Sequence, residues 1–139
     1  MSRSYDLSRF ESAHRRDYTK ALREIKNGKK TSHWMWYIFP QIQGLGHSEK
    51  ARYYGIRDRE EAEEYWQDPM LSAHLLELCR ELLKLKSPIS WIMGYPDDLK
   101  LKSCMTLFWL VTGERTFKDV LDKFYAGKLD ERTKEKLQS

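Results

Sequence analysis

The strongest signal in the pattern of apolar and polar positions is an unbroken run of bulky side chains from Trp34 to Phe39. A helix built from these residues has no polar face, so we expect it to be buried on most sides and to anchor the core. Aromatic residues also favour strands, but the chain offers no second strand to pair with this one. The run therefore predicts a helix that Thr31 or Ser32 caps and Pro40 ends.

Apolar residues at helical spacing recur along the rest of the chain. Tyr18, Ala21 and Ile25 share one stripe, and leucines follow one another every three or four residues from Leu71 to Leu85. Together with caps, glycines and prolines, the pattern predicts further helices over residues 7–14, 17–27, 48–54, 59–67, 70–84, 89–93, 95–111, 117–125 and from 130 onward. The sequence therefore predicts a single all-α domain over residues 1–139, with about eight to ten helices.

Composition limits the classes of protein to consider. The 139 residues are 40% hydrophobic and 13% aromatic, enough for one folded core, and the net charge is +4. Basic residues are scattered among acids, so a nucleic-acid partner is not expected. No apolar run approaches the length of a membrane span, and Cys79 and Cys104 are expected to be reduced core residues, so we expect a cytoplasmic protein. The histidines lack metal-ligand spacing, and we predict neither a metal site nor a cofactor.

The loop after Pro40 is the first candidate site. Glycines let the backbone approach a ligand closely, and the helix that follows offers free amides and a positive dipole end to an anion. The alternative is an ordinary turn in which Ser48 is only a helix cap. In the binding interpretation Trp36 stacks on the ligand, although core packing would also explain it. The candidate ligand-binding residues here are Ser32, Trp36, Gln41, Gln43, Gly44, Gly46, His47, Ser48, Lys50 and Arg52.

The start of the predicted helix at 95–111 is the second candidate site. Asp97 and Asp98 precede a very apolar half-helix, where charges are costly to bury unless they are paired or used. We take Asp97, Asp98 and His33 as candidate catalytic acids or bases. The alternative is that the aspartates only favour the helix start and that His33 bonds a backbone carbonyl in the core. The candidate ligand-binding residues of this stretch are Lys100, Lys102 and Ser103.

These two stretches carry a family resemblance. Residues 32–46, with Ser-His-Trp-Met-Trp, Phe-Pro-Gln and Gly-Leu-Gly, and residues 96–108, with Pro-Asp-Asp-Leu-Lys-Leu, resemble the bacterial domain-of-unknown-function family eighteen-ten. The resemblance extends over nearly the whole chain. It implies a small helical domain in an orthogonal or horseshoe-like array. Some members carry a calpastatin-like label, which these residues do not support, and the family is loosely associated with NAD and ADP-ribose metabolism. It supplies no catalytic residues.

Three classes of function remain open at this point. The first is binding of an anionic small molecule, phosphorylated and nucleotide-like, with hydrolysis or group transfer as the reaction if the protein is an enzyme. The second is a protein-interaction module without catalysis, which would present a flat apolar patch. The third is a nucleic-acid-binding module, whose affinity would fall steeply with salt.

Overall fold

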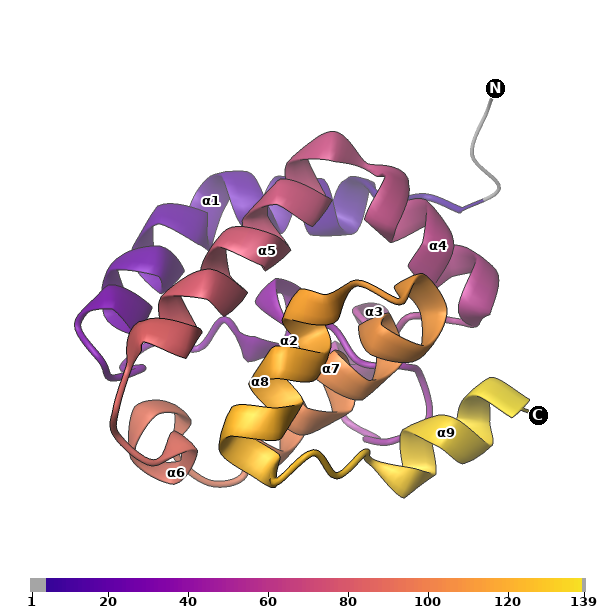
Figure 1. Cartoon of the computed structure of the whole chain (residues 1–139). Helices are drawn as coiled ribbons and strands as arrows, with labels where there is room; N and C mark the ends of the chain where they lie inside the picture. Colours follow the sequence, from indigo (N-terminus) through magenta and orange to yellow (C-terminus); the bar gives the residue numbers. More distant parts are fainter. Residues whose placement is uncertain (1–4, 139) are drawn as a thin grey trace.

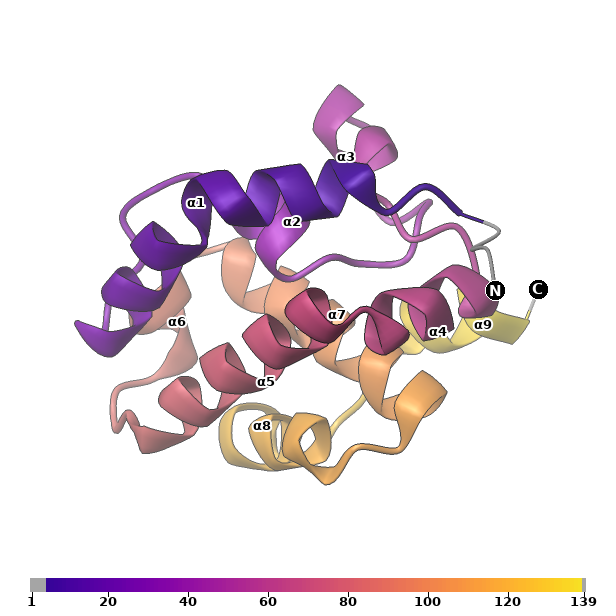
Figure 2. The same cartoon turned by 90° about the horizontal axis from the view of Figure 1, so that it is seen from above.

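Helix α7 (Asp97–Thr112) lies at the centre of the molecule (Figures 1 and 2). The computed structural model describes residues 5–138, and within them residue 101 and all of residues 103–108 of this helix are buried. A helix that is apolar on nearly every side must be covered on every side, which explains why so many elements surround it. The helices that pack against α7 are α4 (Arg59–Gln67), α6 (Ile89–Met93), α8 (Arg115–Tyr125) and α9 (Glu131–Gln138).

Two long helices, α1 (Ser8–Lys26) and α5 (Pro69–Lys84), lie side by side and cover one side of this core (Figures 1 and 2). Asp68 caps α5 by accepting hydrogen bonds from the backbone nitrogens of Met70 and Leu71, both at 3.0 Å. Pro69 occupies the first helical position, where its missing N–H costs nothing. The predicted leucine stripe is buried as far as Leu82, so this part of the sequence pattern is confirmed.

Helix α1 corrects one prediction. The sequence suggested a first helix ending near His14 and a second beginning at Asp17, but Ser8–Lys26 is a single helix. No glycine or proline interrupts this stretch, so nothing forces a break. Asp17 does not cap a helix start; its carboxylate accepts a hydrogen bond from the Tyr37 hydroxyl at 2.5 Å.

The aromatic run is buried as predicted but is less helical than expected. Its helix, α2, is limited to Met35–Ile38, and of residues 34–39 only Trp36 is partly exposed. The predicted cap is absent, because the Ser32 hydroxyl donates to Glu24 at 2.5 Å instead. The Trp34 indole N–H donates to the same carboxylate at 3.0 Å, so the end of α1 fixes the start of the run.

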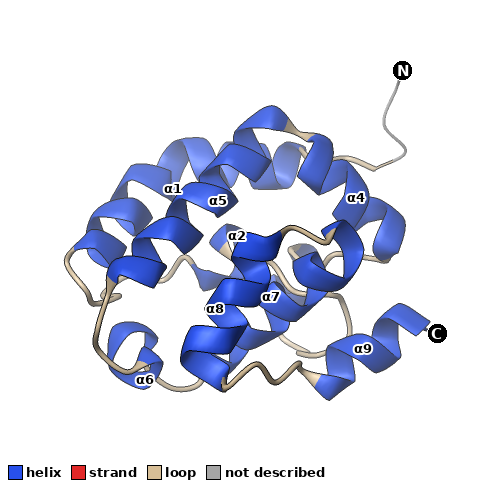
Figure 3. Cartoon of the chain, in the orientation of Figure 1, coloured by secondary structure: helices blue, strands red, loops and turns tan. Residues whose placement is uncertain are grey.

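The segment between α2 and α4 contains the short helix α3 (Glu49–Tyr53), which stands out from the body beyond α1 in Figure 2. A single parallel bridge between Ile42 and Ile56 closes this segment at its base. The bridge belongs to no strand, and Figure 3 shows only helices and loops along the described chain. Residues 5–138 thus form a single compact all-α domain with nine helices, as the sequence predicts. Over the same residues, no helix has the length and apolarity needed to cross a membrane.

Candidate ligand-binding site

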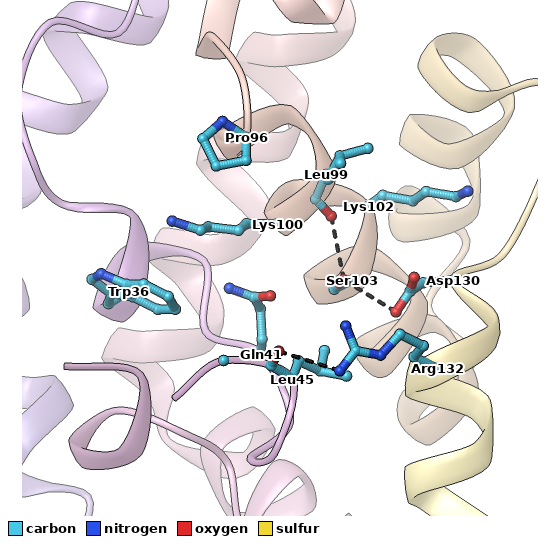
Figure 4. A pocket seen from close by; sticks show the side chains of 11 residues that line it. Trp36, Gln41, Leu45, Pro96, Leu99, Lys100, Lys102, Ser103, Asp130 and Arg132 are labelled. Atoms are coloured by element: carbon cyan, nitrogen blue, oxygen red, sulfur yellow. Dashed lines mark hydrogen bonds between the residues drawn. The ribbon is translucent and has the colours of Figure 1, made fainter. Parts of the chain in front are cut away.

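Two adjoining cavities lie between α2, the loop at residues 41–46 and the first turns of α7. They share Trp36 and Lys100, which separate a larger chamber of about 340 Å³ from a smaller one of about 160 Å³. Figure 4 shows the larger chamber, which extends to the start of α9. The smaller cavity, lined by Lys30, Lys50 and Lys100 with His33 and Asp97, is called the lysine chamber below.

The lysine chamber is built around one carboxylate. Asp97 accepts from the ammonium of Lys30 at 2.8 Å through one oxygen and contacts the ammonium of Lys100 at 3.2 Å through the other. The side chain of Lys30 is only 7% exposed, and its ammonium also donates to the Ser32 carbonyl at 2.6 Å. A buried ammonium is costly to desolvate, so Lys30 depends on these two partners. They hold its positive charge at a fixed place in the cavity wall.

Trp36 forms the partition between the chambers. The Lys100 ammonium lies 4.1 Å from the centre of the indole, so a cation occupies one face of this ring. Gly46 packs against the far edge of the indole, where an added Cβ would lie 3.5 Å from a ring carbon and 3.0 Å from the Ala51 side chain. This glycine therefore permits close packing of the loop against the indole.

Gln41 lies in the wall of the larger chamber. The bridge fixes its backbone, because the Ile56 nitrogen donates to the Gln41 carbonyl at 2.8 Å. The residue is 9% exposed, and its side-chain nitrogen has no hydrogen-bond partner among the described residues. Buried amides of this kind are rare in folded proteins and call for an explanation.

The far end of the larger chamber is formed by the start of α9. One oxygen of Asp130 accepts from the Ser103 hydroxyl at 3.1 Å, from the Thr133 nitrogen at 3.1 Å and from the Thr133 hydroxyl at 2.5 Å. Arg132 closes the mouth by donating to the Leu45 carbonyl at 3.3 Å. Ser103 thus connects α7 to α9 and presents its hydroxyl at the chamber wall.

The structure brings most of the predicted residues together. Trp36, Gln41, Gly46, Lys100, Lys102 and Ser103 line the larger chamber. His33, Lys50 and Asp97 line the lysine chamber with Trp36 and Lys100. Both predicted stretches therefore meet at this hollow, although even their nearest lining residues, Lys50 and Asp97, are 47 positions apart along the chain.

Other predicted residues lie elsewhere. Gln43 and Arg52 line a separate cavity of about 290 Å³, next to Arg9 and Arg57. Ser48 is an ordinary cap for the five-residue helix α3, since its hydroxyl accepts from the Ala51 nitrogen at 3.1 Å.

The remaining predicted residues also fall outside both chambers. Ser32 is engaged by Glu24, and Asp98 accepts from the Leu99 nitrogen at 3.0 Å through its side chain and from the Tyr125 hydroxyl at 2.5 Å through its carbonyl. Gly44 adopts a positive φ of 99° and approaches Lys136, and His47 is exposed.

Several lining residues were not predicted. They are Lys30 and Met35 in the lysine chamber, and Leu45, Pro96, Leu99, Asp130 and Arg132 in the larger one. Lys30 had a usable signal, because it follows the glycine that ends α1 and belongs to an isolated lysine pair. Asp130 was identified only as the cap of a tail helix, which it is, and its position in the chamber depends on packing that the sequence does not show.

The charge of the hollow is positive on balance. Of the described residues, Lys30, Lys50, Lys100, Lys102 and Arg132 line the two chambers, against the carboxylates Asp97 and Asp130. Because the walls also have a low dielectric constant, such an excess attracts anions more strongly than the modest net charge of the whole chain does.

The fold and the hollow define a class, a small all-helical domain with a basic cavity at the start of its central helix. Within that class, the family described as "Protein of unknown function (DUF1810)" matches residues 4–137, and the chain belongs to this family. The chain is also similar to the conserved hypothetical protein Rv1873 from Mycobacterium tuberculosis, whose crystal structure superposes with a TM-score of 0.95 at 41% identity, covering 97% of this chain and 98% of that one. No protein of curated function matches the chain.

Proposed function

We propose that the protein binds a phosphorylated, nucleotide-like small molecule in the hollow formed by the two chambers. The observation that carries the proposal is the buried ammonium of Lys30, which Asp97 holds in the wall of the lysine chamber beside Lys50 and Lys100. Ammonium groups at a fixed place in a cavity are suited to phosphate, which they bind as point charges. The larger chamber, at about 340 Å³, is within the range of small-molecule sites and has room for the rest of such a ligand.

Turnover of the ligand is the second part of the proposal. His33 lies in the lysine chamber with Lys50, where an imidazole is able to donate or accept a proton at the phosphate end of the ligand. Both oxygens of Asp97 are engaged by lysines, so this residue is better suited to positioning them than to taking a proton. Hydrolysis or group transfer is the reaction class that these groups support.

A cytoplasmic location and an association with NAD or ADP-ribose metabolism belong to this proposal as well. Cys79 and Cys104 are both buried and free, which agrees with a reducing compartment. The association with ADP-ribose comes from the family resemblance, so these compounds enter the first panel of ligands to be tested.

The test is a thermal-shift screen of the full chain against nucleotides, sugar phosphates, NAD and ADP-ribose, followed by calorimetric titration of the compounds that stabilise it. A ligand at a hundred times its dissociation constant adds about 2.7 kcal/mol to the free energy of unfolding, so it raises the melting temperature by several degrees. Lys50 and Arg52 supply a matched pair of variants, because both lie on α3 but line different cavities.

We expect Lys50→Ala to weaken binding about fivefold, since a partly exposed ion pair contributes up to about 1 kcal/mol. Arg52→Ala removes the same charge from the same helix and should leave the dissociation constant unchanged. Equal losses in the two variants would indicate only a general effect of charge, and no stabilisation by any compound of the panel would contradict the proposal.

A protein-interaction function is the second candidate, and an exposed group of large apolar side chains favours it. Trp91, Tyr95 and Leu99 are 60%, 80% and 49% exposed around the turn between α6 and α7. Replacing Trp91 and Tyr95 by serine should abolish binding of a protein partner but leave small-molecule binding intact, because neither residue lines a chamber.

A further inference from the structure

The two chambers differ in the kind of group that they offer to a ligand. The lysine chamber presents three ammonium groups, from Lys30, Lys50 and Lys100, against the single carboxylate of Asp97. The larger chamber is lined by Lys100, Lys102 and Arg132 and presents a second carboxylate, from Asp130, at its opposite end. A ligand that spans both chambers therefore meets an end suited to an anion and an end suited to hydrogen-bond donors.

The Asp130 carboxylate accepts its side-chain hydrogen bonds through only one of its two oxygens. All three hydrogen bonds that it accepts through its side chain, from Ser103 and Thr133, go to the same oxygen. Its other oxygen takes part in none of these three hydrogen bonds, and Figure 4 shows the carboxylate beside Ser103 at the chamber wall. A free carboxylate oxygen repels phosphate and accepts hydrogen bonds from hydroxyl groups, as acidic residues do with ribose in unrelated nucleotide sites.

The two cations near Asp130 do not reverse this preference. Figure 4 shows the Lys102 side chain directed away from Trp36 and Gln41. The Arg132 guanidinium is held at the mouth by its hydrogen bond to the Leu45 carbonyl. Both line the larger chamber and help to attract an anionic ligand, but neither accepts hydrogen bonds, so Asp130 is the lining carboxylate to which hydroxyl groups can donate.

Gln41 lies between the two ends. In Figure 4 its amide nitrogen is directed toward Trp36, at the partition, and its oxygen toward Ser103. The nitrogen is shielded from solvent and has no partner among the described residues, so it is a donor without an acceptor. An oxygen of the ligand, at the point where it passes from one chamber to the other, would complete this group.

We infer that the ligand is a phosphate ester of a sugar or nucleoside with a fixed orientation: its phosphate lies in the lysine chamber, and its neighbouring hydroxyls donate to Asp130 in the larger one. This inference rests on the proposed function and adds the position and the chemical identity of both ends. It makes Asp130 and Gln41 specificity-determining residues, one for hydroxyl donors and the other for the linking oxygen.

The test compares three probes by calorimetric titration: adenosine 5′-monophosphate, its 2′,3′-dideoxy form and adenosine. In the unaltered protein, the dideoxy form should bind about tenfold more weakly than the full nucleotide, since hydrogen bonds to a charged acceptor are the stronger kind. Adenosine should bind at least about fivefold more weakly, because it lacks the group that the lysines hold.

Asp130→Asn is the decisive variant. Asparagine is also a good helix cap, so the variant should keep α9 and its melting temperature while losing the charge. It should bind the nucleotide and its dideoxy form within about threefold of each other, because the preference for hydroxyls depends on a charged acceptor. Asp98→Asn is the matched control. This carboxylate lies in the first turn of α7 but lines neither chamber, so the variant should keep the full preference for the nucleotide over its dideoxy form.

The outcomes distinguish failure of the inferred orientation from failure of the proposed function. Equal binding of the nucleotide and its dideoxy form to the unaltered protein, with affinity that Lys50→Ala still lowers, would overturn the inferred orientation and leave the proposed function standing. Undiminished discrimination in Asp130→Asn would also overturn it. Absence of any binding that depends on Lys50, for all phosphorylated probes, would overturn the proposed function and this inference together.

Discussion

The buried polar groups of α1 and the polar groups that line the two chambers differ in how far the chain itself satisfies their hydrogen bonds. On α1, the two ring nitrogens of His14 are both engaged: Nε2 donates to the Tyr37 carbonyl at 2.9 Å, and Nδ1 accepts from Nδ1 of His74 at 3.0 Å. In the hollow, the buried Gln41 amide nitrogen has no hydrogen-bond partner among the described residues, and the partly exposed Asp130 accepts its hydrogen bonds from Ser103 and Thr133 through one oxygen only.

Glu24 is the other example on α1. Its carboxylate accepts from the backbone nitrogens of Thr31 and Ser32 at 2.7 and 2.9 Å, from the Ser32 hydroxyl and from the Trp34 indole. Burial alone would raise the pKa of Glu24, but these hydrogen bonds outweigh it and lower the pKa to about 2. The comparison teaches that a buried polar group whose partners all come from the chain stabilises the fold, whereas one left without a partner at a cavity wall costs stability and calls for an explanation.

The largest effect should come from Glu24→Ala, which breaks the complete network. Four donors lose their acceptor, two of them backbone amides, and we expect the free energy of unfolding to fall by about 4 kcal/mol. Urea denaturation followed by circular dichroism measures the change. Glu63→Ala, at an exposed position of α4, should change stability by less than about 0.5 kcal/mol. A loss in Glu24→Ala no larger than in that control would show that the network contributes nothing.

Acid should have the next largest effect, through His14. The pKa of His14 is lowered to about 4. Burial is the main cause and the neighbouring His74 adds to it, while the hydrogen bond to the Tyr37 carbonyl acts in the opposite direction. The unfolded chain, with an ordinary pKa of 6.5, therefore takes up the proton first. The contribution of His14 to the free energy of unfolding is fully present above pH 6.5 and is lost as the pH drops toward 4. The loss is about 3 kcal/mol, since one pKa unit corresponds to about 1.4 kcal/mol.

Urea denaturation at a series of pH values measures this loss. His14→Gln should be less stable at neutral pH but should lose most of the slope between pH 6.5 and 4. His47→Gln, at an exposed position, should keep it. The contribution of Glu24 has a separate window: it is complete above its ordinary pKa of 4.5 and is lost as the pH falls toward 2. A slope that persists unchanged in His14→Gln would assign the acid loss to other groups.

The smallest effect has the opposite sign. Gln41→Leu replaces an incomplete buried amide by an apolar group of similar size, so we expect a gain of about 1 kcal/mol in the free energy of unfolding. The same variant should weaken ligand binding, which is the trade-off expected of a site residue. Gln43→Leu is the control, because the Gln43 amide is exposed and donates to the Arg52 carbonyl at 3.0 Å. Destabilisation by Gln41→Leu would show that the amide has a partner within the protein.

The sequence was most informative where local pattern decides the structure. The proline that begins α5, its leucine stripe and the buried run at Trp34–Phe39 could all be predicted, because each depends on neighbours within one or two turns. The break expected between residues 14 and 17 is wrong, because Ser8–Lys26 is a single helix, and the partner of Asp17, Tyr37, is 20 residues away along the chain.

Pairings across the fold set the limit of prediction. His14 and His74 are 60 residues apart, and no spacing rule joins them. The same holds for Ser103 and Asp130, which meet only because α9 packs against α7. Gln41 and Lys50 were found through the glycine loop, but which side of α3 faces the hollow was not visible, and Arg52 was therefore grouped with Lys50 although it lines another cavity.

The bridge between Ile42 and Ile56 gives a residue outside the main hollow control over its shape. Gly55 precedes the bridge, and a Cβ there would come within 2.9 Å of the Ala51 carbonyl oxygen and 3.0 Å of the Gln43 Cα. Both of these atoms belong to the backbone, so no change of side-chain rotamer can relieve the close contact. A single methyl group at Gly55 would therefore push the two stems of the α3 segment apart and carry Gln41 with them, so the shape of the larger chamber depends partly on a position that does not line it.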